Sequence, residues 1–268
     1  MIDGGAMFGV VPKAIWQKIY PADENNLCNY CMRCLLVETG NRKVLIDTGI
    51  GNKQEERFFR LYHLNGDDSL EKSLHKNGLD FEDITDVIIT HLHFDHCGGA
   101  VVYNKEASKY EPAFPNALYH IGKRQWDWAV NPNRRERASF LKENILPIAE
   151  SGRLELLETG QEVLPGIKVR FFEGHTEGQV VPFIDYKGKT VVYVGDLLPT
   201  AANIPMAYIP AYDIRPLVTL EEKKAFFLEA LQNDYILFFE HDIYVECCRL
   251  TETEKGVRCG EQFGIGEV

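Results

Sequence analysis

Short apolar runs rich in β-branched and aromatic residues recur along the chain and predict strands. The runs are 34–38, 43–47, 86–90, 117–121, 168–172, 180–184, 190–194 and 235–239. Segments with helical periodicity lie between them, at 55–62, 69–77, 122–130, 135–149 and 220–231. We expect the last helix to begin at Thr219, because Glu222 three residues later completes a capping box. The mixture predicts an α/β protein.

The strands at 86–90 and 235–239 are apolar without alternation. A strand with one exposed face would alternate apolar and polar residues, so these strands are expected in sheets that are covered on both faces. Helices must therefore flank the sheets. No Pro/Gly/Ser-rich linker or block of charge divides the chain, which favours one domain over residues 1–268.

Two segments, 38–49 and 185–196, follow the same pattern. Each reads as a strand, a tight turn, a buried strand and then an acidic residue beside glycine. Two similar half-units would explain the pattern, and so would chance similarity between two hairpins, because turn chemistry alone generates it. Both interpretations stay open.

Composition narrows the classes of protein. The chain has 268 residues, of which 45% are hydrophobic, enough for a large core. The net charge of -11 argues against binding nucleic acid or an anionic membrane, and favours a small-molecule substrate. No apolar run approaches the roughly 20 residues that span a membrane, so we expect a cytoplasmic protein. Seven cysteines, an odd number, favour reduced thiols.

The strongest chemical pattern is THLHFDHCGG, residues 90–99, directly after the apolar strand 86–90. In an extended segment, His91, His93 and Asp95 would point the same way because their spacing is two residues. The neighbouring His96 would then need a backbone turn, for which Gly98 and Gly99 supply freedom. Four ligand-type side chains within six residues suit two ions better than one.

Imidazole and carboxylate donors together favour zinc, iron, manganese or nickel over calcium or magnesium, which prefer oxygen alone. The alternative is a polar turn whose histidines are only hydrogen-bonded. Eight histidines spread over the chain would seldom place three in six positions by chance.

With His175 in EGHTEGQ, Asp196 in VYVGD and His241 in FFEHD, the chain resembles the metallo-β-lactamase superfamily. That family carries H-x-H-x-D-H, then a distant His, a distant Asp and a last His, and the resemblance spans about residues 30–245. Each distant residue also follows a predicted strand, where α/β sheets gather ligands. The resemblance implies a four-layer αββα sandwich, with two mixed sheets flanked by helices.

The resemblance also implies how the ligands are shared. His91, His93 and His175 would hold one ion, Asp95, His96 and His241 would hold a second, and Asp196 would bridge both. Asp95 and Asp196 are then the catalytic carboxylates. The expected cofactor is two divalent metal ions, zinc first, with iron, manganese or nickel as alternatives. A hydroxide bound between the ions would be the nucleophile, since metal binding lowers the pKa of water toward ~7.

Several further residues are candidates with weaker signals. By the same resemblance Asp47 would orient a ligand histidine, although it could equally be structural at a hairpin end. The N-terminal segment 3–16 looks like the opening of lactonase-like members, so Phe8 could line a substrate pocket or pack in the core. The Pro-rich segment 199–216 is expected to face the substrate, with Tyr208 and Tyr212 as candidate donors.

Three cysteines, Cys28, Cys31 and Cys34, have a double C-x-x-C spacing. A zinc or iron–sulfur site would need a fourth ligand, so ordinary packing is preferred there, and also for Cys97 inside the metal motif.

The resemblance favours a metal-dependent hydrolase acting on a carboxylic ester or lactone, with lactonase-like and organophosphate-hydrolase-like members nearest. The alternatives are hydrolysis of a phosphotriester or phosphodiester, and a mononuclear-iron oxidoreductase similar to persulfide dioxygenases. The sequence leaves the oligomeric state open and is compatible with a homodimer.

Overall fold

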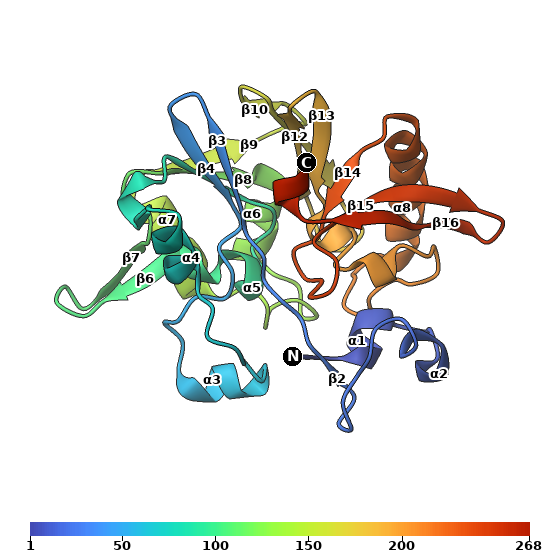
Figure 1. Ribbon diagram of the computed structural model, residues 1–268. Coiled ribbons are helices and arrows are strands. Elements are labelled where there is room, and N and C mark those ends of the chain that lie inside the picture. The colour runs from blue at the N-terminus through green and yellow to red at the C-terminus, as the bar shows by residue number, and fades with distance from the viewer. The chain divides into compact units, whose positions relative to one another are not determined.

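The computed structural model describes residues 1–268, and the chain divides into two compact units (Figure 1). Unit 1 consists of residues 1–31, 166–177 and 181–268, and unit 2 of residues 32–165 and 178–180. Both units are therefore discontinuous in sequence. No helix combines the length and the apolar character that crossing a membrane requires. That the two units make up one domain over 1–268 stays a prediction.

Unit 2 is built on a mixed sheet with the strand order β3-β4-β5-β8-β9. Its strands are β3 (Leu35–Thr39), β4 (Arg42–Ile46), β5 (Asp86–Ile89), β8 (Leu118–Gly122) and β9 (Leu154–Leu157). The hairpin β3–β4 is antiparallel, and the pairs from β4 to β9 are parallel. All residues of β5 are buried, as its continuous apolar sequence predicts.

Three helices cover one face of this sheet: α4 (Leu70–Lys76), α6 (Lys123–Val130) and α7 (Lys142–Glu150). Their buried residues join Val87 and Ile89 of β5 in a single hydrophobic cluster. Because side chains alternate along a strand, Val87 and Ile89 lie on the same face. The helices therefore bury that face of the sheet.

The helix predicted over 135–149 begins later, at Lys142. The side-chain oxygen of Asn133 accepts the backbone N–H groups of Arg135, at 2.7 Å, and of Glu136, at 3.1 Å. Such local bonds give the backbone an alternative to the helix, so residues before 142 form turns. The remaining regular elements of unit 2 are α3 (Glu56–Leu61), α5 (Phe94–Cys97), β6 (Val101–Asn104), β7 (Lys109–Pro112) and β10 (Glu162–Leu164).

Unit 1 contains a second mixed sheet, in which β11, β12, β13, β14, β15 and β16 follow one another in that order. Their bounds are β11 (Ile167–Phe172), β12 (Gln179–Tyr186), β13 (Lys189–Tyr193), β14 (Ile236–Phe238), β15 (Cys247–Thr253) and β16 (Gly256–Phe263). The pair β13–β14 is parallel and the pairs β12–β13, β14–β15 and β15–β16 are antiparallel. The hairpin β15–β16 was not expected from the sequence.

The long helix α8 (Pro216–Gln232) lies beside β14 and β15 (Figure 1). Phe226 and Phe227 on this helix pack against Val192 of β13 and Leu237 of β14 in one hydrophobic cluster. This packing anchors the helix to the sheet of unit 1 and positions the segment that precedes it.

The predicted start of α8 at Thr219 is wrong, because the helix begins at Pro216. Proline suits the first helical position, where its missing N–H group costs no hydrogen bond. The Thr219 hydroxyl instead donates to Asp213 at 2.7 Å. Glu222 accepts the N–H groups of Glu173 and Gly174 rather than closing a capping box.

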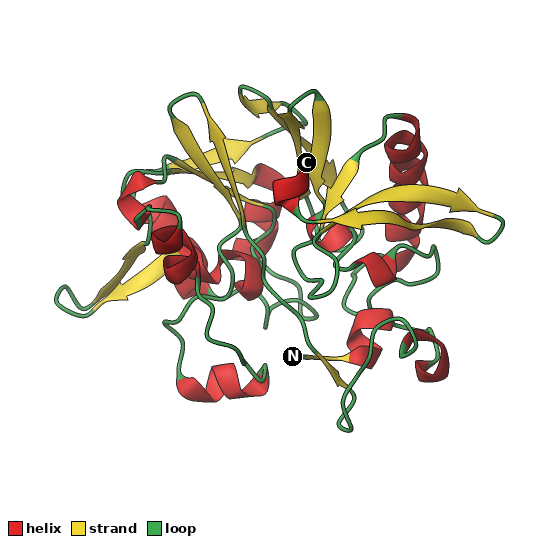
Figure 2. Ribbon diagram, viewed as in Figure 1, coloured by secondary structure: helices red, strands yellow, loops and turns green.

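The N-terminus of unit 1 forms a small aromatic subdomain from β1 (Ile2–Asp3), α1 (Gly4–Phe8), α2 (Lys13–Trp16) and β2 (Leu27–Cys28) (Figure 2). Its core is Met7, Phe8, Trp16, Tyr20 and Cys28. Both predicted hairpins also form: β3–β4 lies in unit 2 and β12–β13 in unit 1. The mixed α/β class with two mixed sheets confirms the predicted fold class.

Candidate metal centre

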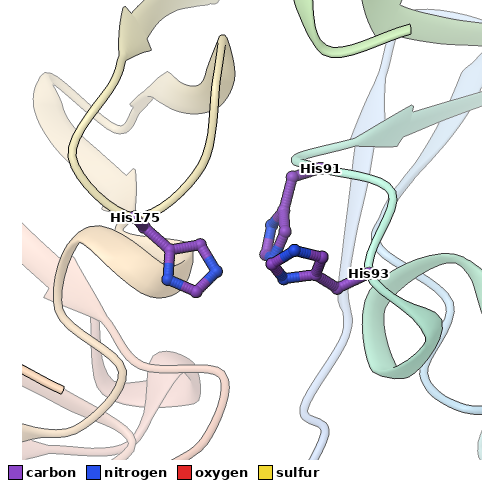
Figure 3. Close-up of side chains that lie close together, drawn as sticks. All are labelled: His91, His93 and His175. Atoms are coloured by element: carbon purple, nitrogen blue, oxygen red, sulfur yellow. The ribbon is translucent and has the colours of Figure 1, made fainter. Parts of the chain in front are cut away.

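The H-x-H-x-D-H motif occupies the loop that leaves β5 and the short helix α5 of unit 2. Figure 3 shows the first two side chains of the motif, His91 and His93. The expectation of an extended backbone through Asp95 is wrong, since α5 begins at Phe94. The His93 carbonyl accepts the N–H groups of His96 and Cys97, both at 3.1 Å, so the chain turns directly after His93. The motif is therefore extended over its first half and helical over its second.

This change of direction brings the four ligand-type side chains of the motif together. The imidazole rings of His91 and His96 have centroids 3.9 Å apart, and those of His91 and His93 have centroids 4.6 Å apart. An Asp95 oxygen lies 4.0 Å from Nε2 of His96. His91 and His96 are fully buried and His93 nearly so. The three imidazole rings thus share one small buried region of unit 2, and the Asp95 side chain beside it is 26% exposed.

The two glycines that follow the motif act through close packing, not through a turn. A Cβ atom on Gly98 would lie 2.1 Å from the Ile50 carbonyl oxygen, and one on Gly99 would lie 2.2 Å from that of Thr48. Any side chain there would push the motif away from the segment that follows β4. That segment carries Asp47.

Asp47 fixes the orientation of His96 and is fully buried. Its Oδ2 atom lies 3.0 Å from Nδ1 of His96, and its carboxylate also accepts the backbone N–H and the hydroxyl of Thr90, both at 2.7 Å. The Thr90 hydroxyl donates its proton to Asp47, so it can only accept from His91 Nδ1, 3.1 Å away. In both histidines Nδ1 carries the proton, and Nε2 is the atom that can bind a metal.

His93 lies beside a buried carboxylate. Its Nε2 atom is 3.4 Å from Oε1 of Glu136, and the two atoms form no hydrogen bond. The other Glu136 oxygen accepts the indole N–H of Trp128 at 2.7 Å. Sequence reasoning did not find Glu136, because it lies 40 residues beyond the motif in a polar turn.

Unit 1 holds a second cluster, in which one carboxylate lies between two histidines. His175 follows β11, Asp196 lies in the 3₁₀ turn after β13 (Gly195–Leu197), and His241 follows β14. Oδ2 of Asp196 lies 3.2 Å from Nε2 of His175, and Oδ1 lies 3.0 Å from Nε2 of His241. Each oxygen of the Asp196 carboxylate therefore lies close to a different histidine.

The Nδ1 atoms of these two histidines are also held. His175 Nδ1 lies 3.0 Å from Oδ1 of the buried Asp213, and His241 Nδ1 donates to the Cys31 carbonyl at 2.7 Å. A carbonyl can only accept, so His241 carries its proton on Nδ1. Such outer partners are typical of metal-binding histidines, since they fix the ring and its tautomer. Asp213 was not predicted from the sequence.

Two tyrosines cover the same pair of histidines. The Tyr30 ring stacks on His241 with centroids 4.2 Å apart, and the Tyr212 ring meets His175 edge-on at 5.6 Å. Their hydroxyl groups are 2.9 Å apart and share a hydrogen bond. Tyr212 was a predicted substrate-binding residue, whereas Tyr30 was overlooked among the cysteines of CNYCMRC.

Of the other predicted substrate residues, Phe8 lies in the aromatic subdomain and Tyr208 packs against it. Phe8 is fully buried, stacked on Trp16 at 5.0 Å, and meets Tyr208 edge-on at 6.2 Å. Their role in binding substrate stays a prediction.

All seven cysteines are free thiols. Cys97 is buried and donates to the Leu92 carbonyl, and burial raises its pKa to about 12, so it stays a neutral thiol. Cys28 packs in the aromatic subdomain and Cys31 donates to the Glu240 carbonyl at 3.0 Å. These contacts agree with a packing role.

The donor set fits divalent ions with mixed nitrogen and oxygen ligands. Four of the five histidines, His91, His96, His175 and His241, have Nδ1 hydrogen-bonded to a protein oxygen, and Nε2 is therefore presented as a ligand. Buried carboxylates such as Asp47 and Asp196 also need positive charge nearby, because burying an uncompensated charge is costly. Neutral histidines alone do not supply that charge.

The chain belongs to the metallo-β-lactamase superfamily, since the model of that family matches residues 33–241. An N-acyl homoserine lactonase of Bacillus cereus is 28% identical over 249 residues, which is 89% of this chain and 88% of the lactonase. A second N-acyl homoserine lactonase, from Bacillus thuringiensis, is 27% identical over 236 residues, covering 84% of this chain and 86% of the relative.

Solved structures agree with this assignment. A probable metal-dependent hydrolase from Staphylococcus aureus is 30% identical with a TM-score of 0.86, covering 98% of this chain and 94% of the other. The dizinc quorum-quenching lactonase AidC has the same fold, with a TM-score of 0.72 at 23% identity, covering 87% and 80% of the two chains. The protein is a metal-dependent hydrolase with the metallo-β-lactamase fold.

Proposed function

We propose that this protein hydrolyses a carboxylic ester, in particular a lactone, at two divalent ions. The observation that carries the proposal is the position of the Asp196 carboxylate, in which one oxygen lies close to His175 and the other lies close to His241. A carboxylate in this position can bridge two ions, one beside each histidine. The lactonase relatives support the choice of a lactone over other esters.

We assign the ligands as the family pattern implies. The histidines His91, His93 and His175 would hold the first ion, Asp95, His96 and His241 would hold the second, and Asp196 would be a ligand of both. Zinc is the proposed metal, because it accepts imidazole and carboxylate ligands in open catalytic sites and AidC is a dizinc enzyme.

Two bound ions would supply Lewis acidity, which polarises a carbonyl oxygen and makes hydroxide available from water near neutral pH. The residues of the chain have separate tasks. Asp47 holds the imidazole ring of His96 and Asp213 holds that of His175, and each fixes the tautomer of its histidine before a metal binds. No serine or cysteine nucleophile is required, and Cys97 is kept protonated by burial.

The Tyr30–Tyr212 pair supplies hydroxyl groups beside two ligand histidines. In a phenol pair one hydroxyl donates to the other, and the acceptor hydroxyl keeps its own proton for a second hydrogen bond. A donor at this position can bind the oxygen on which negative charge develops during ester hydrolysis. We assign this role to Tyr212, because its ring contacts His175 and its loop follows Asp196.

The test compares substrates on protein that has been stripped of metal and reloaded with zinc. An N-acyl homoserine lactone, an aryl ester and a phosphotriester are assayed side by side, and the metal content is measured by elemental analysis. We expect about two ions per chain and turnover of the lactone or ester. Hydrolysis of the phosphotriester alone would replace the proposal with the organophosphate alternative, and a single iron with persulfide oxidation would replace it with the dioxygenase alternative.

A matched pair of variants distinguishes the loss of a proposed metal ligand from the general effect of removing a histidine. His175→Ala removes a proposed ligand, whereas His75→Ala removes a half-exposed histidine on α4 that pairs with Asp80. We expect His175→Ala to lose bound metal and nearly all turnover, and His75→Ala to keep both. Equal metal content in the two variants would refute the ligand assignment.

A further inference from the structure

Lys223 is a buried lysine on α8 with a side chain that reaches into the loop between Asp196 and the helix. It is 1% exposed, among the most completely buried large side chains of the protein. An ammonium group removed from water is costly unless hydrogen bonds compensate for the lost solvation. The groups that accept hydrogen bonds from its ammonium group therefore indicate the role of this lysine.

The charge is held by a cage of backbone carbonyls. Nζ of Lys223 donates to the carbonyl oxygens of Asn203 at 2.7 Å, Pro205 at 3.1 Å, Met206 at 3.4 Å and Tyr208 at 3.3 Å. These four carbonyls come from one stretch of six residues, 203–208. An ammonium group has three protons, so one of them is shared between two acceptors. The loop is wrapped around a single cation.

The caged stretch is tied to the N-terminal helix of the same unit. The Asn203 side chain donates to the Met7 carbonyl at 3.0 Å, and the Ala211 N–H donates to the Ala6 carbonyl at 2.8 Å. At its start, the Ala201 N–H donates to the Asp242 carboxylate at 2.9 Å. The segment 201–211 therefore has a defined path although it contains neither a strand nor an α-helix.

The same loop ends at the metal centre of unit 1. Tyr212 contacts the His175 ring, and the next residue, Asp213, holds Nδ1 of His175 at 3.0 Å. Asp213 also accepts from Thr219, on the same helix as Lys223. A change in the path of 203–208 would therefore move the residues that orient His175.

We propose that Lys223 is a positioning residue, whose ammonium group fixes the loop 203–208 and thereby sets where Tyr212 and Asp213 meet His175. Only the catalytic consequence of this inference rests on the proposed function. The effect on the loop itself depends on the cage alone. Burial lowers the pKa of Lys223 to about 7, while the Asp213 carboxylate acts in the opposite direction, so the ammonium form dominates at pH values well below 7.

Hydrogen–deuterium exchange of the full, zinc-loaded chain at pH 6 tests the cage directly. Lys223→Met keeps an unbranched side chain one atom shorter than lysine and removes the charge and the donors. The matched control is Lys224→Met on the same helix, since Lys224 has a largely exposed side chain that pairs with Glu221. We expect amides of 203–211 to exchange roughly tenfold faster in Lys223→Met, because buried carbonyls lose their donor. Amides of β5 and the control variant should match the wild type.

Four outcomes are separable. Unchanged exchange over 203–211 in Lys223→Met overturns the proposal, whatever the protein hydrolyses. Faster exchange with an unchanged kcat on a lactone overturns the link from the loop to His175, whereas a fall in kcat several times larger than any change in KM supports it. An inactive wild type counts against the proposed function and leaves the exchange result standing.

A wild-type measurement covers the case in which Lys223→Met does not fold. In ¹⁵N-labelled protein at pH 6, we expect the Hζ–Nζ signal of Lys223 to persist, because carbonyl acceptors slow the exchange of its protons with water. Exposed lysines such as Lys224 should lose this signal. If the Hζ protons of Lys223 exchange with water as fast as those of Lys224, the proposed cage is wrong.

Discussion

The two ligand clusters are built in opposite ways. In unit 2, four ligand-type side chains come from six consecutive residues that follow one strand. In unit 1, the three come from segments after three different strands, β11, β13 and β14. The first cluster needs only a local change from extended chain to helix after His93. The second needs a sheet that brings distant parts of the chain to one edge.

The positions of the carboxylates differ as well. In unit 2, Asp47 lies outside the histidines and holds His96 by a ring nitrogen. In unit 1, Asp213 does the same for His175, but Asp196 lies between His175 and His241. A local motif therefore supplies ligand-type side chains, whereas a carboxylate placed between two histidines depends on the tertiary fold.

The largest effect is expected for the central carboxylate of unit 1. Asp196→Asn keeps the shape of the side chain but removes its charge, so one ion should bind weakly while the fold persists. Loss of a residue that orients a metal ligand typically lowers metal affinity or activity by roughly 10–100-fold. Loss of a ligand shared by two ions should therefore lower kcat by more than roughly 100-fold. Circular dichroism serves as the folding control. Turnover near that of the wild type would contradict a bridging role.

The outer carboxylates should have intermediate effects that differ in which ion is lost. Asp213→Asn loosens His175, and Asp47→Asn loosens His96, so each should weaken metal binding by roughly 10–100-fold. Under the proposed assignment these histidines belong to different ions. Titration of metal-free protein with zinc should therefore show the weaker step at a different site in each variant. Identical binding curves would show that the two ions are not held separately.

The tyrosine pair should have a smaller effect. Tyr30→Phe keeps the ring that stacks on His241 and removes only the hydroxyl that meets Tyr212. We expect kcat for a lactone to fall by a few-fold, since a hydrogen bond between neutral groups contributes about 1 kcal/mol. Tyr212→Phe should cost more, because it removes the proposed donor to substrate. If the order were reversed, the donor would be Tyr30.

The smallest effect is expected at the other end of β5, away from the ligand motif. Burial raises the pKa of Asp86, but hydrogen bonds from His120 and Thr85 outweigh it, and the net pKa is lowered from its usual value. A lowered pKa means that this carboxylate stabilises the fold above about pH 4, and that the stabilisation is lost as the pH falls through the folded-state pKa. Arg42, which pairs with Asp86 at 3.1 Å, contributes to the shift.

Arg42→Ala should therefore make the protein less stable by about 1 kcal/mol or less at about pH 6, and the difference from the wild type should shrink toward about pH 3 as Asp86 becomes protonated, measured by urea unfolding across this range. Metal content and kcat should stay unchanged. Arg57→Ala is the control, because the Arg57 side chain and its partner Glu55 are both 83% exposed. A loss of bound metal in Arg42→Ala would show that the two ends of β5 are coupled.

The sequence by itself determined the local features of this protein. The apolar runs located most strands of both sheets, because a strand buried on both faces has to be continuously apolar. The contiguous motif at 90–99 identified four donors, since closeness in sequence guarantees closeness in space. The start of α8 and the length of α7 were wrong, because tertiary contacts of Thr219 and Glu222 and the local bonds of Asn133 took precedence over helical signals.

Only the tertiary structure decided which polar residues far apart in sequence meet. Asp213, Glu136 and Tyr30 carry no local pattern that separates them from ordinary loop residues. They became recognisable when the fold placed them on the ring nitrogens or ring faces of His175, His93 and His241. The cage around Lys223 also depends on the tertiary structure. Every residue type has a backbone carbonyl, so the sequence does not mark these acceptors, and they converge on a cation only when the loop is folded.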